Sequence, residues 1–199
     1  MQFYPHPFIT EAQPRSAMQT PVVLRVVLSL WFCLALPLPV VAGDGAIPNP
    51  ARTGLSADGH LQLHPDDTCP ICAMRPAKRP KFAAAIELTD GRTYYFCGNG
   101  CMLRSWLHPE AFLGAAPEQR LKPVVQVFFT GKPMDARRVT WVAGSDVMGP
   151  MGPAIVALEN PEMAKAFRQR HGGKHEFKLE EWNVALGEMV QGRKALRCA

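Results

Sequence analysis

The sequence lacks the patterns that mark most enzymes and nucleic-acid-binding proteins. It has no paired carboxylates, no Ser/His/Asp arrangement and no phosphate-binding loop. Its net charge is only +5, and its densest basic run, residues 75–81, is not interleaved with aromatic residues, so nucleic-acid binding is not expected. Long helices are also disfavoured, because 19 prolines and 16 glycines in 199 residues favour turns and short elements. The basic run is expected to be a solvated face, or a rim that attracts an acidic partner protein.

One long apolar run is present, at residues 21–42, and it predicts export. Two prolines interrupt it and it ends in Val-Val-Ala, which is typical of a cleaved secretory signal rather than a membrane span. The residues before Met18 are polar and rich in proline, so Met18 competes with Met1 as the start of translation. Cys33 lacks the small residues that precede a lipid-modified cysteine. We expect a periplasmic or exported protein cleaved after Ala42, with an uncleaved membrane anchor as the alternative.

Four of the six cysteines form two tight pairs, and a methionine follows each pair. The groups are Cys69 and Cys72 with Met74, and, after an interval of 24 residues, Cys97 and Cys101 with Met102. Thiolate and thioether sulfur are soft donors, which prefer Cu(I), zinc or an iron–sulfur cluster. Because a neutral thioether favours Cu(I) over zinc, the pattern predicts a protein that handles a soft metal ion.

The spacing of the cysteines leaves several kinds of site open. Cys69, Cys72 and Met74 are close enough in sequence for a three-coordinate site, which Cu(I) accepts. All four cysteines would equally suit a closed tetrahedral zinc site, and the spacing alone does not separate zinc from copper. Two disulfides within the pairs, or a redox-active Cys-x-x-Cys, are further alternatives in an oxidising compartment. The βαβ pattern typical of thioredoxin-like redox motifs is missing around Cys69.

A glycine- and proline-rich loop at residues 144–153 contains two more sulfur atoms, those of Met148 and Met151. Three glycines and two prolines make a stiff loop that can present a thioether to an ion. Core packing is the ordinary alternative for a methionine. Asp146 is a candidate to cap the loop backbone.

The order of predicted elements occurs twice, as strand, strand, helix, strand. The first set comprises strands 82–88 and 93–96, a helix at 102–107 and a strand at 124–129; the second comprises strands 139–143 and 154–158, a helix at 161–171 and a strand at 174–177. Asn160 and Pro161 mark the start of the second helix. The sequence therefore predicts an α+β fold of two tandem ββαβ units.

The predicted divisions follow this order. They are an N-terminal extension with the signal or anchor segment (1–42), a flexible lead-in (43–65), a first ββαβ unit with the cysteine motifs (66–131), a second unit with the methionine loop (132–180) and a C-terminal helix or tail (181–199).

Taken together, these motifs resemble the NosL family, copper-binding accessory proteins of nitrous oxide reductase maturation. The matching segments are DTCPICAM (67–74), PAKRPKF (76–82), FTGKPMDA (129–136), GSDVMGPMGP (144–153) and the helix at 162–171, and the resemblance covers roughly residues 66–182. It implies two ββαβ domains like those of an organomercurial lyase, an exported location and delivery of Cu(I) during denitrification. It also implies that Met151 is a copper ligand, and that the recipient is apo nitrous oxide reductase or its membrane assembly complex.

Two features depart from that family. Many members are lipoproteins, whereas this sequence has no convincing lipid-attachment cysteine. Its second pair, Cys97 and Cys101, resembles instead the Cys-x₃-Cys end of TRASH-type metal-binding modules. The first unit is therefore a candidate to hold a metal site of its own.

The resulting hypothesis is an exported Cu(I) metallochaperone that is not an enzyme. Its candidate ligands have three roles: capture by Cys69, Cys72 and Met74, retention and release by Met151 with Met148, and exchange or reinforcement by Cys97 and Cys101. Two alternatives belong to other classes. One is a structural or sensory Cys₄ zinc module, and the other is a thiol enzyme, either a disulfide oxidoreductase or an organomercurial lyase-like protein.

Overall fold

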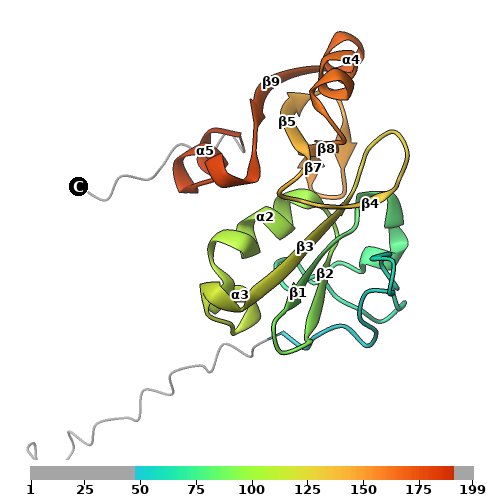
Figure 1. Ribbon diagram of the computed structural model, residues 1–199, viewed down its shortest axis with the longest axis vertical. Helices are drawn as coiled ribbons and strands as arrows, with labels where there is room; N and C mark the ends of the chain where they lie inside the picture. Colours follow the sequence, from blue (N-terminus) through green and yellow to red (C-terminus); the bar gives the residue numbers. More distant parts are fainter. Residues whose placement is uncertain (1–47, 191–199) are drawn as a thin grey trace, which may run out of the picture. The chain divides into compact units, whose positions relative to one another are not determined.

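The computed structural model describes residues 48–190, so the predicted signal segment and the end of the predicted tail lie outside the described residues. Within this range the fold is α+β and consists of two ββαβ units, as the sequence predicts (Figure 1). None of the helices in residues 48–190 is long and apolar enough to cross a membrane.

The first unit contains a four-stranded antiparallel sheet in the order β2-β1-β3-β4. Its elements are β1 (Ala84–Leu88), β2 (Thr93–Phe96), α2 (Asn99–Leu107), α3 (Pro109–Leu113), β3 (Arg120–Gln126) and β4 (Pro133–Asp135), with short 3₁₀ turns at Pro76–Lys78, Pro80–Phe82 and Pro117–Gln119. Residues 133–135 were predicted in the second unit, but Met134 pairs with Val125 of β3. Backbone pairing therefore places β4 in the first sheet.

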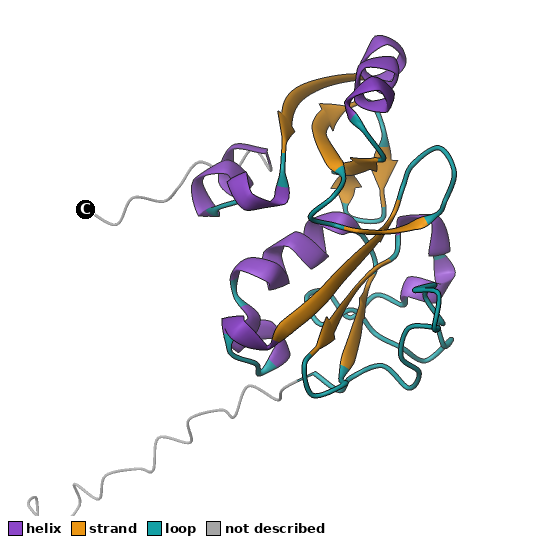
Figure 2. Cartoon of the chain, viewed as in Figure 1, coloured by secondary structure: helices purple, strands orange, loops and turns teal. Residues whose placement is uncertain are grey.

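Both faces of the first sheet are covered, which explains why β1 and β2 are buried at almost every position. Alternate residues such as Ile86 and Tyr94 share a buried cluster with residues of α2, which lies beside the sheet (Figure 2). The opposite face, around Tyr95, is covered by Leu55, Leu61 and other apolar residues of the segment before the cysteine motifs. The Tyr95 hydroxyl also donates to the Gly54 carbonyl at 2.8 Å.

The packing of residues 48–65 corrects the expectation of a flexible lead-in. The sequence predicted residues 43–65 to be a flexible lead-in because they are rich in glycine and proline. In the structure, residues 48–65 instead lie against the sheet, because their leucines bury apolar surface there.

The second unit is a three-stranded antiparallel sheet in the order β8-β5-β9 with one helix on it. Its elements are β5 (Thr140–Ser145), β8 (Val156–Leu158), α4 (Pro161–His171) and β9 (Gly172–Phe177), followed by a 3₁₀ turn at Leu179–Glu181 and α5 (Val184–Val190). The predicted cap of α4 is confirmed, since the Asn160 side chain accepts a hydrogen bond from the Met163 amide. Val142 and Leu158 pack against Phe167 of this helix.

The predicted methionine loop forms a small hairpin. Strands β6 (Met148–Gly149) and β7 (Gly152–Pro153) pair across it, with Met148 opposite Pro153. Pro150 and Met151 form the two-residue turn between them. The pairing of β6 with β7 therefore fixes the orientation of the Pro150-Met151 turn.

One buried cluster spans the two units. Trp141 of β5 stacks on Phe177, and both belong to the buried cluster that contains Leu103 of α2. Two side-chain hydrogen bonds also cross between the units: Asn99 Nδ2 donates to the Ile155 carbonyl at 2.8 Å, and Trp182 Nε1 donates to the Leu103 carbonyl at 3.1 Å. This packing holds the methionine hairpin close to the beginning of α2.

Candidate metal centre

The four cysteines of the two motifs converge at one place. Their sulfur atoms all lie within 4.8 Å of one another. Cys72 Sγ is 3.3 Å from Cys97 Sγ, and Cys97 Sγ is 3.7 Å from Cys101 Sγ. All four are free thiols, so the alternative of two disulfides is not what the structure contains. The fold therefore joins the two sequence motifs into one cluster.

A tight turn presents the first pair of cysteines. The Ala73 amide donates to the Cys69 carbonyl at 2.9 Å, and the Cys69 amide donates to the Met74 carbonyl at 2.8 Å. To close this turn, Ala73 adopts a left-handed conformation with φ of 57°. A non-glycine residue in this region is strained by roughly 1–3 kcal/mol, so the surrounding contacts must hold the turn in shape.

The second pair straddles the junction between β2 and α2. Cys97 immediately follows β2, and Cys101 lies in the first turn of α2, whose N-cap is Gly98. The sequence predicted this helix from Met102 onward, whereas it begins at Asn99. The earlier start turns the Cys101 side chain back toward Cys97, because helical side chains point toward the N-terminus of their helix.

Burial and mutual hydrogen bonding perturb these thiols. Cys69, Cys97 and Cys101 are buried, and Cys72 is half-buried. Hydrogen bonding from the Cys101 and Cys97 thiols lowers the pKa of Cys69 far below its usual value, despite the opposing effect of burial. Hydrogen bonding to Cys69, then to Cys97, together with burial, raises the pKa of Cys101 far above its usual value. One negative charge is therefore accommodated easily, and further deprotonation needs a compensating cation.

The exposed thioether of Met74 lies next to the cysteine cluster. Met74 is 41% exposed and lines a surface hollow of about 420 Å³ together with Cys97 and Pro150. Three basic side chains, those of Arg75, Lys78 and Arg79, complete this basic hollow. The basic run of the sequence is therefore adjacent to the thiols rather than remote from them.

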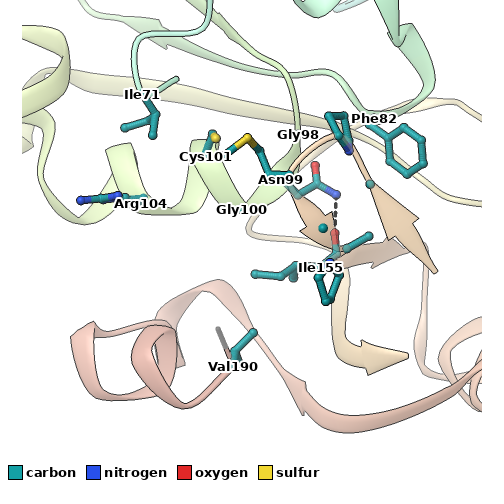
Figure 3. Close-up of a pocket in the computed structure, with 15 residues that line it drawn as sticks. Ile71, Phe82, Gly98, Asn99, Gly100, Cys101, Arg104, Ile155 and Val190 are labelled. Atoms are coloured by element: carbon teal, nitrogen blue, oxygen red, sulfur yellow. Dashed lines mark hydrogen bonds between the residues drawn. The ribbon is translucent and has the colours of Figure 1, made fainter. Parts of the chain in front are cut away.

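The methionine hairpin also lies next to the cluster, because Pro150 and Met151 line hollows that contain cysteines of the cluster. Met151 is 57% exposed and lines a pocket of about 220 Å³. Cys101 and Asn99 line the same pocket (Figure 3). Pro150 lies against the start of α2, since a Cβ placed on Gly98 would be 3.8 Å from Pro150 Cδ. Met148 is 62% exposed and is not among the residues that line either hollow.

Asn99 and Arg104, which the sequence did not single out, also belong to this pocket. The Asn99 side chain joins α2 to Ile155, as the dashed line in Figure 3 shows. Its buried Oδ1 atom has no hydrogen-bond partner among residues 48–190. The only sequence signal for Asn99 was its place between two glycines in the Cys-x₃-Cys motif.

An organomercurial lyase-like protein would need a carboxylate placed between two reactive thiols, and Asp146 does not lie in such a position. Asp146 Oδ1 is 2.9 Å from His171 Nδ1, and the Asp146 amide donates to the His171 carbonyl at 3.0 Å. This contact ties the base of the hairpin to the end of α4, and Asp146 is not part of the thiol cluster.

Two tandem ββαβ units with clustered thiols and an exposed thioether hairpin define a small, sulfur-rich candidate metal-binding protein. The NosL family model matches residues 60–181, and the chain belongs to this family. It is similar to the "Copper-binding lipoprotein NosL" of Stutzerimonas stutzeri, with 28% identity over 130 residues, covering 63% of this chain and 67% of the relative. It also resembles the crystal structure of the copper chaperone NosL from Shewanella denitrificans, with a TM-score of 0.53, 20% identity, and coverage of 65% of this chain and 99% of that one. At 20% identity, the likeness to the crystal structure shows a shared fold.

Proposed function

We propose that this protein is an exported carrier of Cu(I) that supplies copper for the maturation of nitrous oxide reductase. Family membership and the names of the two relatives, a copper-binding lipoprotein and a copper chaperone, support this proposal. The observation that carries it is the position of Met151, an exposed thioether at the tip of a hairpin beside buried thiols.

Exposed thioethers suit a carrier for a chemical reason. They are soft and neutral, so they bind Cu(I) without releasing a proton. A site with few ligands also leaves room for a ligand of the recipient to join before the donor's ligand leaves. Met74, Met148 and Met151 are all exposed enough for such an exchange.

The exposure of each sulfur ligand suggests which of them meets copper first. Cys69, which the sequence suggested as a capture ligand, is only 2% exposed, and its backbone amide and carbonyl close the turn that carries it. We therefore assign first contact with copper to Met151 and Met74, which line two hollows that share Pro150 in their lining. Met148, on the same hairpin, is the candidate for an additional ligand.

Anaerobic titration of the reduced, full-length protein with Cu(I) against a chromophoric chelator tests this assignment. Met151→Ala is expected to weaken Cu(I) binding by at least about tenfold, roughly 1.4 kcal/mol, because it removes a direct ligand. Met163→Ala is the matched control, since Met163 is also exposed but lies on α4. Unchanged affinity in both Met151→Ala and Met74→Ala would contradict the thioether site.

The recipient and the compartment are part of the proposal. In a host that reduces nitrous oxide, loss of this protein should leave nitrous oxide reductase poor in copper, and the wild-type chain should restore its copper content. Met151→Ala should restore less. Full copper loading without the protein would argue against delivery to this enzyme.

A further inference from the structure

We propose that the four clustered thiols form a separate, resident site for a tetrahedral divalent ion, with zinc as the expected occupant. This site goes beyond the copper-carrier function, because the cluster and the exposed thioethers can be filled independently. In this arrangement the buried cluster is structural and the methionines bind the cargo.

The separations between the sulfur atoms suit a tetrahedral ion. Zinc binds thiolate sulfur at about 2.3 Å, so the sulfur atoms of a regular ZnS₄ tetrahedron are about 3.8 Å apart. The separation between Cys97 Sγ and Cys101 Sγ is 3.7 Å, that between Cys72 Sγ and Cys97 Sγ is 3.3 Å, and no pair in the cluster exceeds 4.8 Å. These separations therefore differ from those of a regular tetrahedron by no more than about 1 Å.

The environment of the cluster suits a resident ion better than a transferable one. Three of its four cysteines are buried, and four sulfur ligands leave no open coordination position for a recipient's ligand. Charge favours a divalent ion as well. Four thiolates with Zn²⁺ carry a net charge of −2, whereas with Cu(I) they carry −3, and uncompensated charge is costly in a buried site. Arg104 and the basic residues around Cys97 can offset part of that charge.

A resident ion also explains how the first unit holds the methionine hairpin. The ion would join the Cys69–Cys72 turn, the end of β2 and the first turn of α2. The start of α2 then contacts the hairpin through Gly98 and Pro150, and anchors Ile155 through Asn99. Binding of such an ion contributes directly to folding free energy. The ion therefore shapes the platform on which copper is bound.

The test is metal analysis of the full-length protein purified under reducing conditions, together with titration of the apoprotein with Co²⁺. We expect about one zinc per chain, and visible absorption typical of a tetrahedral Co²⁺–thiolate complex. Zinc affinity should fall at least about tenfold in Cys72→Ser and Cys101→Ser, because each removes a ligand. Cys198→Ser, which changes a cysteine outside both motifs, and Met151→Ala should both retain zinc. The wild-type Co²⁺ spectrum keeps the test decisive if Cys101→Ser does not fold.

A Cu(I) titration of the zinc-loaded protein separates this inference from the proposed function. Copper bound with zinc still in place supports two sites. Zinc retained without any copper binding also supports the zinc site, and contradicts the carrier function instead. Expulsion of zinc by one equivalent of Cu(I), unaffected by Met151→Ala, would overturn the inference and make the thiols the cargo site. Absence of zinc and Co²⁺ binding by a protein with four reactive thiols in the cluster would overturn it as well.

Discussion

Replacing Asn99 with alanine tests whether α2 holds the methionine hairpin in place. The Asn99 Nδ2 atom donates to the carbonyl of buried Ile155 at 2.8 Å. Ile155 follows Ala154, the first residue after the hairpin. Asn99→Ala leaves this carbonyl without its donor, which costs about 1–3 kcal/mol. The same change removes the buried Asn99 Oδ1 atom, which lacks a partner within residues 48–190, and this recovers about 1 kcal/mol. The expected net loss in the free energy of unfolding is therefore about 1 kcal/mol.

Asn99→Asp should be more destabilising, because it removes the donor and adds a partly buried charge. The start of α2 favours a negative charge by only about 0.5 kcal/mol, so we expect a net loss of about 2 kcal/mol. Equilibrium unfolding in urea, followed by tryptophan fluorescence, measures both losses. Asn49→Ala, at an exposed position, is the matched control and should change stability by less than about 0.5 kcal/mol.

The same variants should also affect the proposed copper site. If Asn99 positions the hairpin, Asn99→Ala weakens Cu(I) binding without removing a ligand, by an amount smaller than that for Met151→Ala. Wild-type stability together with wild-type Cu(I) affinity in Asn99→Ala would refute the reasoning. A loss of stability with unchanged copper affinity would limit Asn99 to a structural role.

Two further predictions concern the surroundings of the thiol cluster. Ala73→Gly should raise the free energy of unfolding in urea by about 0.5 kcal/mol, because the relief of strain at the left-handed φ of 57° outweighs the added conformational entropy of the unfolded chain. Ala73→Val should lower the free energy of unfolding. The opposite order of the two variants would contradict strain in the turn. Charge reversal in the basic hollow, by Lys78→Glu with Arg79→Glu, should slow Cu(I) transfer to copper-free nitrous oxide reductase about tenfold at low salt, and remove its salt dependence. Lys165→Glu on α4 is the control, and equal effects of both changes would exclude local steering.

Much of the fold could be predicted because its signals are local. The Asn160-Pro161 cap sets the start of α4, and the predicted strand at 93–96 matches β2. The order of the two ββαβ units was likewise visible in the spacing of apolar runs and turns. These features depend on residues close together in the chain, so a sequence alone can reveal them.

The features that could not be predicted depend on distant contacts. Pro133–Asp135 joins the first sheet only because β3 offers an unpaired edge there. Residues 48–65 have the composition of a linker, yet their leucines cover the face of the sheet around Tyr95. Neither Leu55 nor Leu61 shows this from its neighbours in sequence, since the surface that each covers lies in another part of the chain.

The candidate metal site likewise has features that the sequence reveals and features that depend on distant contacts. The residues along the chain show which soft donors are present, where each thiol and thioether lies, and the resemblance to a copper-binding family. They do not show which sulfur atoms share one site, because that depends on folding. Packing brings Cys97 within 3.3 Å of Cys72, leaves Met74 exposed, and places Met151 in a pocket with Cys101. The physical reason is that strand register, the start of α2 and the shared core set distances between motifs, and these distances are fixed by non-local packing rather than by spacing along the chain.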